Sequence, residues 1–251
     1  MAKSLRQWID SEVRDIRAKP MSWLSQYHFF RDPTRPMWSD TSCFFAPADG
    51  IILYEKIVVA PDDPIVEIKG KPYSLRDALR DESYDKPSLV IGIFMTFFDV
   101  HVNRIPFPGR LTYKMLEPIE TYNRPMLDVE KTILEELRIS MDDATYLHAN
   151  QRVVNRVESI QLGQPYYILQ IADYDVDSVM PFNLKQHQPY AQGQRFSQIR
   201  YGSQVDLIVP LSPRYEFSLK HPPGLHVEAG VDSLIAISET RAQALACEEV
   251  A

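Results

Sequence analysis

The feature that most constrains the fold is the position of the 19 prolines, most of which separate short apolar segments. Proline cannot donate a backbone hydrogen bond, so it interrupts helices and central strands and suits the connections between strands. The separated segments are rich in Val, Ile, Tyr and Phe, which favour strands. These segments are residues 44–52, 66–70, 89–97, 152–160, 165–172, 196–200, 205–209 and 225–237. The pattern predicts an α+β, strand-rich single domain with a barrel- or sandwich-like β core.

Three segments have helical rather than strand periodicity. Residues 4–18 place apolar side chains at helical spacing between charged ones, which predicts an N-terminal amphipathic helix. Shorter peripheral helices are expected at 74–79 and 127–137. We divide the chain into an N-terminal helical region (1–28), a catalytic domain (29–240) and a polar C-terminal tail (241–251). The apolar stripe of the first region has three alternative partners: the core, another subunit or a membrane surface.

Composition excludes several classes of protein. The net charge of −7 argues against nucleic acid as a partner, because phosphate binding needs a basic surface. Cys43 and Cys247 are far apart, which predicts neither a disulfide framework nor a zinc site and suits a reducing compartment. The most apolar run, residues 89–100, is too short to span a bilayer. With no signal peptide expected, we predict a cytoplasmic protein with peripheral contact at the inner face of the membrane.

Three groups that can carry chemistry lie in turn-like settings between apolar segments. They are Asp49 before Gly50, His101 after an apolar run, and Ser203 after Gly202. A carboxylate, an imidazole and a hydroxyl are the groups that make a serine oxygen nucleophilic. Taken singly, each has a simpler interpretation as a turn residue or a hydrogen-bonded core histidine. The absence of a G-x-S-x-G motif gives a conventional α/β-hydrolase little support.

The order of seven short motifs is more specific than any one of them. The chain resembles the phosphatidylserine decarboxylases, pyruvoyl-dependent carboxy-lyases of phospholipid biosynthesis that cut themselves at a Gly-Ser bond. The resemblance covers most of the chain. The matching segments are residues 29–35 (Phe-Phe-x-Arg), 47–50 (Pro-x-Asp-Gly), 68–75 (Lys-Gly-x-x-Tyr-Ser-Leu), 99–106 (the histidine segment), 150–152 (Asn-x-Arg), 170–172 (a core strand) and 193–206 (the cleavage region).

The resemblance implies a self-processing mechanism. Ser203 would attack the carbonyl of Gly202, and the chain would split there to leave a pyruvoyl group derived from the serine. Asp49 and His101 would activate the hydroxyl. The pyruvoyl group would form an imine with the substrate amine and accept the electrons released with CO₂, so that no metal or diffusible cofactor is needed. The implied reaction converts phosphatidylserine to phosphatidylethanolamine, and the implied assembly is a homodimer of processed chains.

The sequence departs from the better-known members of the family at one important position. Where they carry a second histidine, this chain has Arg104, which is either a salt-bridged structural residue or a ligand for an anionic substrate group. Asp99, Asn103 and Arg104 are therefore candidates for supporting or substrate-binding roles. The Tyr-Gly-Ser-Gln cleavage site resembles the shorter archaeal-type branch, whereas segment 122–148 is longer than expected. The other histidines match no catalytic motif, and we expect them to be structural or exposed.

Two alternative functions stay open from the sequence. One is a soluble pyruvoyl-dependent decarboxylase of a free amino acid, which the acidic balance of the chain favours. The other is a non-catalytic, strand-rich binding module that keeps the fold but has lost processing.

Overall fold

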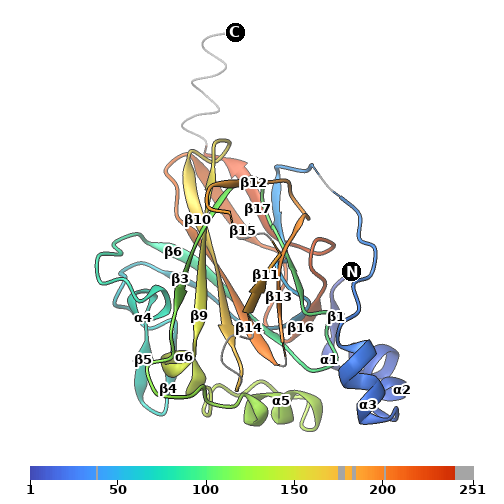
Figure 1. Cartoon of the computed structure of the whole chain (residues 1–251). Helices are drawn as coiled ribbons and strands as arrows, with labels where there is room; N and C mark the ends of the chain where they lie inside the picture. The colour runs from blue at the N-terminus through green and yellow to red at the C-terminus, as the bar shows by residue number, and fades with distance from the viewer. Residues whose placement is uncertain (38, 175–178, 183–184, 201, 241–251) are drawn as a thin grey trace.

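A nine-stranded antiparallel sheet forms the centre of the protein (Figure 1). The computed structural model describes residues 1–37, 39–174, 179–182, 185–200 and 202–240, so the predicted tail at 241–251 lies outside the described residues. The strands of this sheet, in spatial order, are β1 (Lys3–Ser4), β16 (Leu225–Val227), β3 (Gly50–Val58), β6 (Ser88–Met95), β14 (Ser203–Pro210), β10 (Gln164–Ala172), β9 (Arg152–Ser159), β8 (Gly109–Leu116) and β12 (Gln188–Tyr190).

The central strands are buried on both faces, because side chains alternate between two hydrophobic clusters. On β6, Ile91 and Ile93 belong to one cluster, whereas Val90 and Phe94 belong to the other. This period of two is the expected geometry of a pleated strand. Every residue of β6 and of β14 is buried. The sheet is therefore a middle layer, which accounts for the nearly continuous apolar runs seen in the sequence.

Three smaller antiparallel sheets accompany the large one. They consist of β11 (Val179–Pro181), β13 (Arg195–Ile199) and β7 (Val102–Arg104); of β15 (Tyr215–Leu219), β17 (Ser233–Glu239) and β2 (Cys43–Phe45); and of β4 (Val66–Ile68) with β5 (Lys71–Tyr73). The strand-rich α+β class is confirmed. Within the described ranges, however, the sheets do not close, so the barrel form of the predicted core is wrong.

Two predicted strands divide between sheets. The segment 225–237 forms β16 in the large sheet and β17 in a small one, separated by a turn in which Gly230 has φ +70°. Likewise β2 and β3, expected to be joined by the Asp49-Gly50 turn, pair with β17 and with β6, respectively. Asp49 and His226 consequently lie where the chain passes from one sheet to another.

The N-terminal helix is confirmed, and it packs on the protein's own core. It comprises α1 (Leu5–Trp8), the π-helix η1 (Ile9–Val13) and α2 (Arg14–Arg17), followed by α3 (Met21–Trp23) and the π-helix η2 (Leu24–His28). A capping box between Ser4 and Gln7 begins it. Trp8 and Val13 are buried in the second cluster.

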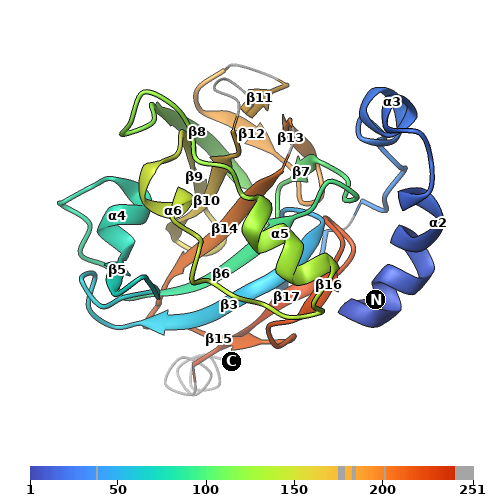
Figure 2. The same cartoon turned by 90° about the horizontal axis from the view of Figure 1, so that it is seen from below.

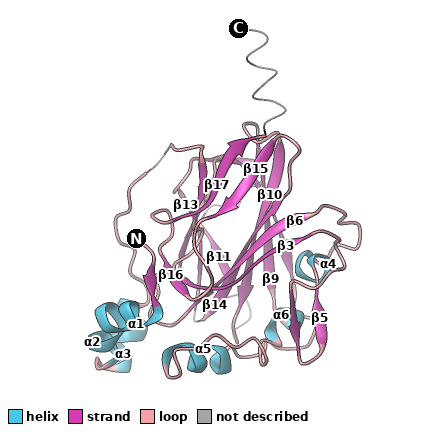
Figure 3. Ribbon diagram, turned by 180° about the vertical axis from the view of Figure 1, so that it is seen from behind, coloured by secondary structure: helices cyan, strands magenta, loops and turns pink. Residues whose placement is uncertain are grey.

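The remaining helices are short. They are α4 (Leu75–Leu79), α5 (Leu127–Leu134) and α6 (Tyr146–Ala149), and α5 ends three residues before its predicted end at 137. Figure 3 shows most helices gathered toward one end of the sheet. In the view from below, α5 crosses in front of β14 and β6 (Figure 2). None of the helices in the described ranges has the length and apolar character needed to cross a bilayer.

Candidate active site

The order of the strands brings the three predicted groups to one end of the sheet. β3 begins at Gly50, directly after Asp49; its neighbour β6 ends at Met95, six residues before His101; and the next strand, β14, begins at Ser203. Because these three strands are antiparallel neighbours, the start of β3, the end of β6 and the start of β14 lie at the same edge. Sequence positions more than fifty residues apart thus converge.

Asp49 is buried, and each oxygen of its carboxylate accepts a hydrogen bond. Its Oδ2 accepts from Arg35 Nη2 at 2.6 Å, and its Oδ1 accepts from the Ala229 backbone N–H at 2.7 Å. Burial raises the pKa of Asp49 to about 6, although the Arg35 charge and the Ala229 hydrogen bond oppose the shift. A polar hollow of about 390 Å³ opens beside this carboxylate, and the charged residues that line it are Glu12, Arg31, Arg35, Asp49, Asp99 and Glu228.

His101 is buried as a neutral imidazole. Its Nδ1 lies 3.1 Å from the Asp99 carbonyl oxygen, which can only accept, so Nδ1 carries the proton. Nε2 is buried and has no hydrogen-bond partner among the described residues. The Phe29 ring packs against the imidazole, with centroids 4.2 Å apart. Burial lowers the pKa of His101 to about 4, which leaves the Nε2 lone pair free to take a proton at neutral pH.

Ser203 and Gly202 form a tightly packed turn at the start of β14. The Ser203 hydroxyl is buried and donates to Met95 Sδ at 3.2 Å. Gly202 has φ +47°, and a Cβ there would lie 2.3 Å from Asp173 Oδ2. Only glycine meets both demands, because it adopts left-handed backbone without strain and leaves room for the carboxylate. The preceding Tyr201 lies outside the described residues.

A second histidine, which matches no sequence motif, lies beside Asp99. His226 Nε2 lies 2.7 Å from Asp99 Oδ1, and both side chains are buried. Burial alone would raise the pKa of Asp99 and lower that of His226. The opposite charges outweigh it, so the pKa of Asp99 is lowered and that of His226 is raised. The sequence gives only a weak signal for this pair, because His226 lies on a short strand and its partner is far away in the chain.

The three supporting candidates separate into different environments. Asp99 joins His226 to His101, as described above. Asn103 Nδ2 lies 3.6 Å from the same Met95 sulfur that Ser203 contacts, so it adjoins the serine. Arg104 instead donates to Gly193 O and pairs with Asp32 at 3.1 Å. These contacts favour the salt-bridged, structural interpretation of Arg104.

The three predicted catalytic groups converge without bonding one another. Among the described residues no hydrogen bond joins the side chains of Asp49, His101 and Ser203; each has its own partner. No cluster of three or more His, Cys, Asp or Glu within those ranges could hold a metal. The site therefore consists of a buried serine, a neutral imidazole and a carboxylate at one sheet edge, beside a polar hollow.

Comparison with known proteins identifies the family. A sequence model described as phosphatidylserine decarboxylase matches residues 25–233, which is most of the chain. The chain belongs to this family. It is 32% identical over 183 residues to the phosphatidylserine decarboxylase proenzyme of Erythrobacter litoralis, covering 72% of this chain and 62% of that protein. It is 31% identical over 186 residues to the proenzyme of the same name from Ralstonia nicotianae, covering 74% and 68%.

Proposed function

We propose that the chain is a self-processing phosphatidylserine decarboxylase that forms phosphatidylethanolamine. Family membership supports the reaction, and the observation that carries the self-processing is the Gly202-Ser203 peptide, held in a left-handed turn at the end of a buried strand. A bond in this setting is constrained before any chemistry occurs.

Self-cleavage requires only groups of the chain and water. The Ser203 Oγ attacks the Gly202 carbonyl carbon, and the peptide shifts to an ester. Loss of the Cα proton then expels the Gly202 carboxylate and leaves a dehydroalanine, which water converts to a pyruvoyl group with release of ammonia. The products are a chain ending at Gly202 and a chain that begins with the pyruvoyl group. In decarboxylation, that group supplies an electron sink.

We assign the proton transfer to His101 and the stabilisation of its protonated form to Asp49. His101 is neutral and its Nε2 is unpartnered among the described residues, so it is the proposed acceptor of the Ser203 proton once the two groups come within hydrogen-bond distance. Asp49, paired with Arg35, provides the negative charge that stabilises a protonated imidazole. The polar hollow beside Asp49 is the proposed place for the serine headgroup, which carries both signs of charge. The four carboxylates of its lining suit the ammonium group, and Arg31 and Arg35 suit the carboxylate or phosphate.

The decisive test is the mass of the intact purified protein. The wild-type chain should yield two fragments, one ending at Gly202, and Ser203→Ala should yield one full-length chain without activity. Ser197→Ala removes another buried serine hydroxyl, which donates to Met180 O, and should process normally. A full-length wild-type chain with decarboxylase activity would refute the mechanism.

Substrate choice separates the proposal from the free-amino-acid alternative. The named relatives favour the lipid, and so we expect CO₂ release from phosphatidylserine in vesicles and none from free serine. The reverse preference would overturn the lipid assignment. Retained processing in either case excludes the non-catalytic module.

We place the membrane contact on the helical N-terminal region. Met21, Trp23 and Tyr27 are exposed apolar side chains of its second half, and Phe30 follows directly after it. They adjoin Phe29, which is buried against His101, so a lipid surface at this region would lie near the site. Trp23→Ser with Tyr27→Ser should weaken flotation with vesicles, whereas Leu211→Ser, on another part of the surface, should not. Contact at the inner face of the membrane and a homodimer of processed chains stay predictions of the family resemblance.

A further inference from the structure

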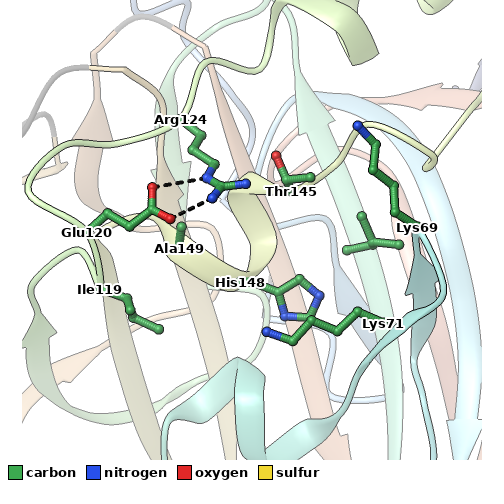
Figure 4. A pocket seen from close by; sticks show the side chains of 9 residues that line it. Lys69, Lys71, Ile119, Glu120, Arg124, Thr145, His148 and Ala149 are labelled. Atoms are coloured by element: carbon green, nitrogen blue, oxygen red, sulfur yellow. Dashed lines mark hydrogen bonds and ion pairs between the residues drawn. The ribbon is translucent and has the colours of Figure 1, made fainter.

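A basic hollow lies apart from the catalytic groups, between the β4–β5 hairpin, α6 and the segment before α5 (Figure 4). Its volume is about 310 Å³, which is at the lower end of the range for small-ligand sites. Lys69, Lys71 and Arg124 contribute three cationic side chains to the lining, and Glu120 is the single acidic one. Thr145 and His148 add neutral polar groups. The lining therefore favours a small anion.

The cations differ in how far they are already neutralised. Arg124 forms a bidentate pair with Glu120, at 3.2 Å from Nε and 2.5 Å from Nη2 (Figure 4). Lys69 pairs with Asp143 at 2.8 Å. Lys71 has no acidic partner within the described part of the chain. One uncompensated positive charge thus remains beside two compensated ones.

His148 gives the hollow an unsatisfied buried atom. Its Nε2 is buried and has no hydrogen-bond partner among the described residues, although buried polar atoms in folded proteins are nearly always paired. The Lys71 side chain passes close to this ring (Figure 4), and burial together with the Lys71 charge lowers the pKa of His148. An oxyanion would accept a hydrogen bond from Nε2 and offset the Lys71 charge at the same time.

The hairpin turn fixes both lysines. Ile68 pairs with Lys71, so Lys69 and Gly70 form a two-residue turn, with φ +52° and +75°. Positive φ at both central residues is the requirement of a type I′ turn, for which asparagine or glycine is the usual first residue. A lysine in that position accepts backbone strain to bring a cation to the rim.

We infer that this hollow binds a phosphate-type oxyanion, with Lys71, Arg124 and the Nε2 of His148 as its donors. Two sources share this chemistry: the phosphate of a lipid headgroup and free inorganic phosphate. The inference does not depend on the proposed function, because it is tested by binding rather than by decarboxylation.

Two segments that line the hollow, α6 and the segment before α5, also contact the cleavage turn. From α6, the hydroxyl of Tyr146 donates to Gln204 Oε1 at 2.7 Å, one residue beyond Ser203. From the other wall, Met126, two residues after Arg124, donates its N–H to Asp173 Oδ1 at 2.8 Å. Asp173 is the carboxylate packed against Gly202. An anion that orders these walls would therefore act on the elements that hold the scissile bond.

The test measures phosphate binding directly on the full chain. Inorganic phosphate is titrated into protein carrying ¹⁵N-labelled histidine, and the His148 signal is assigned by its loss in His148→Gln. We expect a saturable shift of this signal. The double variant Lys69→Gln/Lys71→Gln should weaken binding about thirtyfold, since each lysine near an anionic group contributes a factor of about five and the two factors multiply. The control Lys86→Gln/Lys220→Gln removes two equally exposed lysines elsewhere and should bind like the wild type.

A vesicle arm distinguishes the two sources. Flotation is measured with phosphatidylcholine vesicles that contain or lack phosphatidic acid. If the pocket variant loses both the phosphate shift and the added binding to phosphatidic acid, the occupant is a lipid headgroup. If it loses only the shift, the occupant is free phosphate. If the wild type shows no saturable shift, or if the control variant loses it equally, the inference is overturned.

Discussion

The imidazole of His226 and the carboxylate of Asp99 form a buried hydrogen-bonded pair, 2.7 Å from Nε2 to Oδ1, between residues 127 positions apart. The backbone carbonyl of the same Asp99 accepts the Nδ1 hydrogen of His101. Trp8 stacks on His226, with centroids 4.7 Å apart. Asp99 thus connects the N-terminal helix and β16, through His226, with the proposed base His101.

Loss of this pair should destabilise the protein in a pH-dependent way. His226→Gln leaves the Asp99 charge buried without its partner, a change that typically costs about 3–5 kcal/mol. The lowered pKa of Asp99 contributes stability above its ordinary value of 3.8, and this contribution is lost as the pH falls through the folded value. The raised pKa of His226 contributes fully below 6.5 and is lost as the pH rises through the folded value.

The difference in stability between wild type and His226→Gln should therefore be largest between about pH 4 and 6.5 and should shrink above that range. Urea denaturation at several pH values measures it. His221→Gln, at a partly exposed position, is the matched control and should change little. A deficit that is the same at every pH would show that packing against Trp8, not the charge pair, is what the substitution removes.

Much of this site could be predicted from the sequence, because its parts lie in local motifs. Asp49, His101 and Ser203 each follow or precede a strand that hydrophobic pattern alone places, and sheet order then brings the strand ends together. The strands themselves were predictable because proline and turn residues separate them. The openness of the sheets was not, since closure depends on which distant edges pair, and a strand's own sequence does not record that.

His226 shows why the remainder could not be predicted. It lies on a three-residue strand that the sequence pattern does not separate from β17, and its partner is in another part of the chain. Whether a histidine is exposed or buried with a raised pKa depends on a carboxylate that only the fold supplies. The same reasoning applies to Arg104, because its contacts with Asp32 and Gly193, which favour a structural role, come from distant parts of the chain.

The close packing of Gly202 can be separated from its backbone conformation. Gly202→Ala should slow cleavage strongly, because the new Cβ would lie 2.3 Å from Asp173 Oδ2 in a residue with φ +47°. Gly163→Ala has a similar φ of +68° with nothing within 4 Å of the Cβ, so its loss of stability measures the cost of the backbone strain alone. Processing is followed on gels after pulse synthesis. If the steric contact dominates, Gly202→Ala/Asp173→Ala should cleave faster than Gly202→Ala; equal rates would assign the effect to the backbone.

The rate of cleavage should rise with pH around the pKa of Asp49. Burial raises this pKa to about 6, and the ionised carboxylate is the form that stabilises a protonated imidazole. Precursor from a short synthesis pulse, transferred to buffers between about pH 5 and 8, should show a rising profile with its midpoint near 6. Asp49→Asn should abolish the rise, whereas Asp232→Asn, which changes another buried aspartate, should keep it. An unchanged profile in Asp49→Asn would remove that residue from the mechanism.

Replacing Met95 should slow cleavage markedly but reduce the stability of the fold only slightly. Its sulfur accepts the Ser203 hydroxyl at 3.2 Å and lies 3.6 Å from Asn103 Nδ2, so it fixes the direction of the nucleophile before reaction. Met95→Leu conserves the volume and should cost less than about 1.5 kcal/mol in stability. Without an acceptor the hydroxyl can rotate, and we expect cleavage to slow about tenfold. Met126→Leu, which alters a buried methionine of the other cluster, provides the comparison. The half-time of cleavage and the urea midpoint are measured on all three proteins, and equal half-times for wild type and Met95→Leu would show that the sulfur does not orient the serine.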